Sequence, residues 1–70
     1  MWKRIAVDAS FEEWGYFVGD HPEAAIIISI DSKGWWIVKA FGIPNTTKTF
    51  MTKIKKDAYQ YVSVIKRRMR

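Results

Sequence analysis

The chain has 70 residues, no cysteine, one histidine, a net charge of +5 and 49% hydrophobic residues. Disulfides and thiolate metal sites are therefore excluded, and a lone histidine does not form a zinc site. The length predicts one domain over residues 1–70, too apolar for a disordered tail and without a run long enough to span a membrane. Acids follow Lys3 and Arg4 too closely for a signal peptide, so we expect a cytoplasmic protein. We also expect it to have no cofactor.

The charge is divided unevenly along the chain. Residues 1–32 hold two basic and six acidic side chains, whereas residues 33–70 hold ten basic and one acidic side chain. This asymmetry favours a basic face that meets an acidic partner. The alternative is a solvated surface with charge pairing between the two halves.

Residues 2–7 alternate weakly and predict a short strand. Ser10 with Glu13 three residues later has the pattern of a capping box. A short N-terminal helix is therefore predicted, with Gly19 and Pro22 ending it. Its apolar residues at helical spacing are Phe11, Trp14, Phe17 and Val18.

A run of β-branched residues at 24–30 predicts a strand, and residues 31–34 have the composition of a hairpin turn. Residues 34–41 are expected to return as the second strand. After a turn at residues 42–45, the threonine-rich segment 46–51 predicts a third strand.

From Thr52 onward the apolar period becomes that of an α-helix, which is expected to run to the end of the chain with Thr52 as its N-cap. The predicted fold is α+β: a small three- to four-stranded antiparallel sheet, a short N-terminal helix and a long C-terminal amphipathic helix packed on the sheet. The apolar stripe of the C-terminal helix comprises Ile54, Ala58, Tyr61, Val62, Ile65 and Met69.

Two adjacent tryptophans, Trp35 and Trp36, must face opposite sides of the sheet. Trp36 shares its face with Val38 and Ala40, and one face must meet the C-terminal helix. The N-terminal helix would cover the other face, or that face stays partly open to stack on bases or to bind a protein. A homodimer would also bury it.

Catalysis fits poorly. His21 lies in a loop segment without a nucleophile partner, Glu12 and Glu13 point in different directions on the expected helix, and the glycines form no phosphate loop. We therefore expect that the protein is not an enzyme.

The basic residues of the C-terminal helix are more informative. Cations at its end suit the helix dipole, but Lys53, Lys55 and Lys56 fall in the expected first turn, where the dipole disfavours them by about 0.3–1 kcal/mol each. Lysines around free N–H groups suit a phosphate, although solubility or salt bridges to the acidic half would also explain them. The predicted nucleic-acid-binding residues are Lys48, Lys53, Lys55, Lys56, Tyr59, Lys66, Arg67 and Arg70.

The run from Gly34 to Val38 and the segment from Phe50 to Lys53, with Ala58 following, resemble the AP2-like and arm-type integrase N-terminal DNA-binding domains over residues 34–65. The spacing from Phe50 to Ala58 is two residues longer than in that pattern. The resemblance implies that a three-stranded sheet precedes a helix and that the sheet enters the DNA groove. On this chain it implies contacts from Lys33, Trp35, Lys39 and Lys48.

Two functions follow as hypotheses. The first is a non-enzymatic module that binds nucleic acid, double-stranded DNA in particular, through a basic face. The second is a small inhibitor or adaptor of the kind that phages and mobile elements encode, which binds a protein partner through its basic and aromatic surface.

Overall fold

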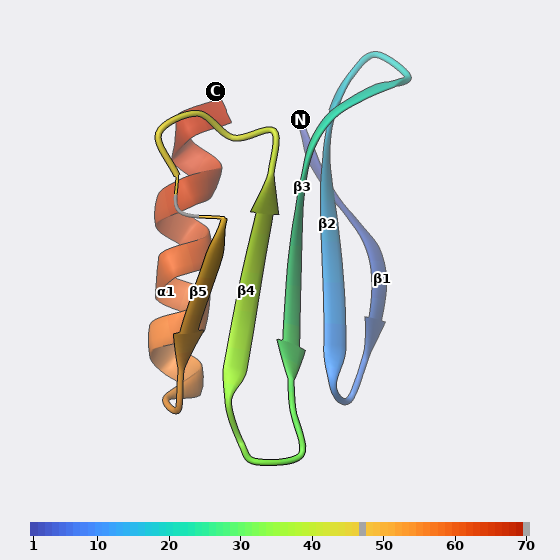
Figure 1. Ribbon diagram of the computed structural model, residues 1–70. Helices are drawn as coiled ribbons and strands as arrows, with labels where there is room; N and C mark the ends of the chain where they lie inside the picture. Colours follow the sequence, from blue (N-terminus) through green and yellow to red (C-terminus); the bar gives the residue numbers. More distant parts are fainter. Residues whose placement is uncertain (47, 70) are drawn as a thin grey trace.

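The computed structural model describes residues 1–46 and 48–69. In this described part of the chain, one antiparallel sheet has five strands side by side in chain order, and a single α-helix follows them. The predicted number of three to four strands is therefore wrong, because residues 11–18 add a strand. Figure 1 shows the helix α1 running along the β4–β5 side of the sheet. The elements are β1 (Trp2–Asp8), β2 (Phe11–Val18), β3 (His21–Ile30), β4 (Trp36–Phe41), β5 (Thr49–Thr52), α1 (Lys55–Lys66) and a 3₁₀ turn (Arg67–Met69).

The N-terminal helix predicted for residues 11–18 is wrong, because this segment forms strand β2. Its pairing with β3 sets Trp14 beside Ile26 and Tyr16 beside Ala24. Aromatic residues occur on both faces of this strand, which hides the two-residue alternation and produces an accidental helical spacing. Intrinsic preference agrees with the structure, since aromatic side chains are enriched in strands.

The segment expected to end a helix is instead a tight hairpin turn between β2 and β3. Gly19 has a φ of 62°, a left-handed conformation that glycine adopts at no steric cost. Pro22 lies within β3, where the pairing with β2 shifts between Tyr16 and Phe17. Proline is tolerated at such an irregularity because no regular ladder hydrogen bond is lost there.

The sheet face toward α1 carries the hydrophobic core. Side chains from β3 and β4 alternate onto this face and meet three fully or almost fully buried residues of the helix. The buried residues are Ala24, Ile26, Ile28, Val38, Ala40, Ile43, Ala58, Val62 and Ile65. The predicted assignment of Trp36, Val38 and Ala40 to one face is confirmed, with Trp36 packed at the edge of this core.

Aromatic rings complete the same face over β1 and β2. The indole N–H of Trp2 donates to the backbone oxygen of Lys66 at 3.1 Å, and its ring meets that of Tyr16 edge-on at 5.3 Å. This contact ties the first strand to the last turn of α1, 64 residues away in the sequence. The core therefore depends on both ends of the described chain.

The opposite side of the sheet, here called the open face, has no helix of the described chain upon it. The predicted cover by an N-terminal helix is wrong, because residues 11–18 are a strand. Ile5, Phe41 and Met51 lie on this face and are each at least half exposed. The central Ile27 and Ile37 are only partly buried, whereas their neighbours on the helix face are buried.

The C-terminal helix is shorter than expected. It begins after Ile54, which has an extended conformation and serves as N-cap without a side-chain hydrogen bond, and its α-helical part ends at Lys66. Ile54 is 57% exposed, so it lies outside the apolar stripe. The long helix from Thr52 to the end of the chain is therefore wrong, while the placement of Ala58, Val62 and Ile65 in the core is confirmed.

Candidate functional site

The turn that connects β3 to β4 and the turn that connects β5 to α1 lie at the same end of the sheet, as Figure 1 shows. In the β3–β4 turn, the Asp31 carboxylate accepts backbone N–H groups from Lys33 and Trp35, both at 2.9 Å. The N–H of Trp35 lowers the pKa of Asp31, with help from the N–H and charge of Lys33. The one acid of this turn thus fixes the backbone that presents Lys33 and Trp35.

The β5–α1 junction supplies the second part of the site. The Thr52 hydroxyl accepts the backbone N–H of Ile54 at 3.1 Å, which shapes the entry into the helix. Lys53 precedes the helix, and its ammonium group donates to the backbone oxygen of Lys33 at 3.4 Å. The two turns are therefore joined directly through Lys53.

Aromatic rings hold two of these lysines. The Lys53 nitrogen lies 5.1 Å from the centre of the Trp35 ring. The Lys55 nitrogen lies 5.6 Å from the Trp36 ring and 5.9 Å from the Tyr59 ring. Such cation–π contacts orient an ammonium group without neutralising its charge.

We call this group the basic end of the sheet. Its members come from two turns and the first turn of α1, and the lysines among them are exposed to solvent. The basic end comprises Lys33, Trp35, Lys53, Lys55 and Lys56, with Trp36 and Tyr59 beneath Lys55.

The remaining residues of the sequence-based site do not join this group. Lys48 precedes β5 while Lys53 follows it, so five residues of extended chain separate them by about 16 Å. Lys39 lies on the open face. Arg67 lies at the far end of α1, and Arg70 is outside the described residues.

Lys66 and Tyr59 have structural contacts rather than free polar groups. The Lys66 nitrogen lies 3.2 Å from the centre of the Trp14 ring, and partial burial lowers its pKa. The Tyr59 hydroxyl donates to Glu12 at 3.3 Å, and burial together with the Glu12 charge raises its pKa. Both side chains therefore have contacts within the protein, away from the basic end, that the sequence did not suggest.

Sequence reasoning missed Trp36 and Ile54. The sequence predicts only that Trp36 shares a face with Val38 and Ala40, whereas in the structure it lies at the edge of the core with Lys55 over its ring. Ile54 was assigned to the apolar stripe, but it is exposed next to Lys53 and Lys55.

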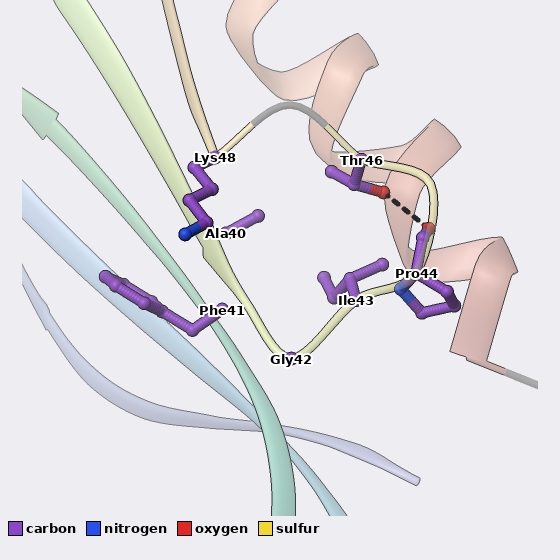
Figure 2. A pocket seen from close by; sticks show the side chains of 7 residues that line it. All are labelled: Ala40, Phe41, Gly42, Ile43, Pro44, Thr46 and Lys48. Carbon is purple, nitrogen blue, oxygen red and sulfur yellow. Dashed lines mark hydrogen bonds between the residues drawn. The ribbon is translucent and has the colours of Figure 1, made fainter.

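A hollow lies at the end of the sheet opposite the basic end. This open hollow of about 510 Å³ is formed mainly by the loop between β4 and β5. Figure 2 shows Phe41 and Lys48 on one side of it and Ile43 and Pro44 on the other, with the Thr46 hydroxyl donating to the Pro44 oxygen at 3.1 Å. Its polar side chains are few, and it does not adjoin the basic end.

Within residues 1–46 and 48–69 there is no cluster of three or more His, Asp or Glu side chains suited to a metal ion. No helix in the described part of the chain has the length and apolar character to cross a membrane. No known family model, curated protein sequence or solved structure matches this chain.

Proposed function

We propose that this protein binds nucleic acid, double-stranded DNA in particular, and that the basic end of the sheet contacts the phosphates. The observation that carries the proposal is the convergence of Lys33 with Lys53, Lys55 and Lys56 from two separate turns. The net charge of +5 adds a long-range attraction to any polyanion.

The local charges support a phosphate ligand. The Asp31 carboxylate is engaged by two backbone N–H groups, and the contacts of Lys53 and Lys55 are with aromatic rings and a backbone oxygen. Asp31 interacts with the charges of Lys33 and Lys53, and Asp57 lies in the first turn of α1. The four lysines still exceed these two acids, so an excess of positive charge remains for a ligand. Lys55 and Lys56 also stand beside the first N–H groups of α1, where the helix dipole favours an anion.

The resemblance to AP2-like and integrase-arm domains adds an expectation of the same class of partner. The residues it shares with the basic end are Lys33 and Trp35. Trp35 is partly exposed and lies at the rim of the basic end, where a flat ring suits contact with a base or sugar.

Two triple variants with the same loss of charge test the proposal. Lys33→Gln/Lys53→Gln/Lys55→Gln removes three ammonium groups from the basic end. Binding to a fluorescent 20-base-pair duplex is measured by anisotropy between 50 and 300 mM salt. If each lysine contacts one phosphate, the variant loses about 100-fold in affinity near 0.1 M salt, and the slope of log K against log salt falls by about 2.7.

The control, Arg4→Gln/Lys48→Gln/Arg67→Gln, removes three exposed charges outside the basic end. We expect it to retain most of the affinity and the slope. Equal weakening in both variants would refute the basic end as the site, and no binding by the unmodified protein at 50 mM salt would refute the function. A single-stranded oligonucleotide of the same sequence shows which form of nucleic acid is preferred.

A small adaptor or inhibitor that binds an acidic protein surface is the second candidate. The observation that favours it is Ile54, which is 57% exposed between Lys53 and Lys55 and offers an apolar contact that phosphates do not use. Replacing Ile54 with Ser separates the two functions. A stoichiometric protein complex that survives nuclease treatment and is lost in this variant supports the adaptor. DNA binding that is unchanged in the variant, with no such complex formed by the unmodified protein, supports phosphate binding.

A further inference from the structure

The open face is the largest feature of the molecule that nucleic-acid binding does not use. Hydrogen-bonded strand pairs align its residues in three rows across the sheet. The rows are Asp8–Phe11–Ser29–Ile37–Met51, Ala6–Glu13–Ile27–Lys39–Thr49 and Lys3–Gly15–Ala25–Phe41. Half of these fourteen residues carry apolar side chains, and the two acids and two lysines leave the three rows without net charge.

A surface of this composition suits a protein better than a polyanion. Phosphate binding requires an excess of positive charge, which the rows lack. Exposed apolar side chains in a contiguous group are typical of an interface instead. Ile5, Phe41 and Met51 are 53%, 50% and 50% exposed, and the partly buried Phe11, Ile27 and Ile37 continue the apolar surface between them.

The middle row specifies the partner. Glu13 on β2 and Lys39 on β4 flank Ile27 on β3, one strand to each side. A half-turn about an axis that runs along β3, between two such faces, exchanges the positions of β2 and β4. Ile27 then meets Ile27 of the second copy, and Glu13 meets Lys39 of the second copy, twice in the same interface.

Another direction of the axis does not give this match. A half-turn about an axis across the strands places Glu13 against Glu13 and Lys39 against Lys39, and like charges in close contact disfavour association. The row is therefore self-complementary for one arrangement only. That arrangement keeps the strands of both sheets nearly aligned, which is the usual geometry of two packed antiparallel sheets.

We propose that the open face binds the open face of a second copy of this chain, forming a two-fold β-sandwich with the helices outside. The interface is isologous, as in most homodimers. The Ile27 side chains of the two copies become buried at the centre of the interface. Beside them, each Glu13 carboxylate faces the Lys39 ammonium group of the other copy, so that the two charges compensate.

The size of the face sets the expected affinity. Five strands about 4.8 Å apart and about 20 Å of strand length give a flat area of about 500 Å² per copy, which protruding side chains enlarge. Stable interfaces bury about 800 Å² per partner, so this one falls at the lower end. We therefore expect a dissociation constant in the micromolar range, about 1–100 µM.

Charge-swap variants test the arrangement by sedimentation equilibrium from about 1 to 500 µM. The unmodified protein should pass from monomer to dimer over this range. Glu13→Lys places lysines opposite each other, Lys39→Glu places glutamates opposite each other, and each variant alone should weaken the dimer at least tenfold. An equimolar mixture of the two should dimerise as well as the unmodified protein, because a lysine at 13 then faces a glutamate at 39.

The variants Asp20→Lys and Arg67→Glu make the same charge changes at exposed positions away from the three rows and from the basic end, and they should dimerise normally. Circular dichroism verifies that each single variant is folded. An unmodified protein that stays monomeric at 500 µM overturns the proposal. Single variants that dimerise normally, or a mixture that does not recover, overturn the two-fold arrangement along β3.

Discussion

Glu12 illustrates how a single residue misled the sequence pattern. It lies on the helix-facing side of β2, a position where alternation predicts an apolar side chain. The Trp14 indole donates to one of its carboxylate oxygens and the Tyr59 hydroxyl donates to the other. A partly buried carboxylate is tolerated because both of its oxygens have hydrogen-bond partners.

Gly15 is a second residue whose role comes from packing. A Cβ atom added to it would lie 2.7 Å from the Ile5 Cδ1 atom and 2.9 Å from the Phe17 Cε2 atom. We expect Gly15→Ala to destabilise the fold by about 1 kcal/mol, because the ends of these side chains must move. Urea denaturation measures this change.

A double-mutant cycle with Ile5→Ala identifies the cause. If the Ile5 side chain is the obstacle, its removal should recover at least about 0.5 kcal/mol of the loss caused by Gly15→Ala. Strictly additive effects of the two substitutions would show that the Ile5 side chain is not the obstacle.

Asp31 supplies a prediction for pH dependence. Its folded-state pKa lies below 3.8, the ordinary value of an aspartate carboxyl, chiefly because the Trp35 N–H bonds to the charged form. Its stabilising contribution is therefore present above about pH 3.8 and is lost as the pH falls through the lower folded-state pKa. The melting temperature of the unmodified protein should exceed that of Asp31→Asn at pH 7, and the difference should shrink below pH 3.8. A difference that does not vary with pH would contradict this origin.

At the scale of the element, the local sequence pattern predicted α1 correctly but predicted a helix where the structure has strand β2. Residues 11–18 satisfied a capping-box pattern and a helical spacing, yet two neighbouring strands pair with them along their length. The helix was recognised correctly because Ala58, Val62 and Ile65 share one side, and all three are buried against the sheet. A periodic pattern is reliable where only one side of an element is apolar, and β2 is apolar on both.

The helix face gives a direct test of this packing. Ile65 is fully buried, whereas its neighbour Val64 is 43% exposed. Ile65→Val should lower the free energy of unfolding by about 0.5–1.5 kcal/mol because it removes one buried methyl group. Val64→Ala, the matched control, should change it by less than about 0.5 kcal/mol. Equal effects in urea denaturation would contradict the assigned orientation of α1.

At the scale of the whole molecule, the two faces of the sheet differ because α1 covers only one of them. The helix covers one face and closes the core, with Trp2 joining the first strand to the last helical turn. The open face and the basic end are the two surfaces to which the proposals assign partners. In the proposed dimer the axis along β3 leaves both basic ends at the same end of the assembly, so a single duplex would meet two clusters of lysine.

The sequence by itself determined the β3–β4 hairpin, the following strand, the amphipathic helix and the opposite orientations of Trp35 and Trp36. These features depend on the residues of single turns and on a clear apolar period. Both can be recognised within short segments of the sequence. Only the tertiary structure decided that residues 11–18 are a strand, since pairing with β1 and β3 outweighs the local helical signals.

The same holds for the candidate site. The sequence pointed to the lysines around the start of α1 as a candidate site, because the helix dipole disfavours positive charge there. Their meeting with Lys33 and Trp35, and the separation of Lys48 from them, follow from strand order and register. The second face of the sheet was open to several interpretations in the sequence, and its exposure was settled by the fold of β2 as a strand rather than a covering helix.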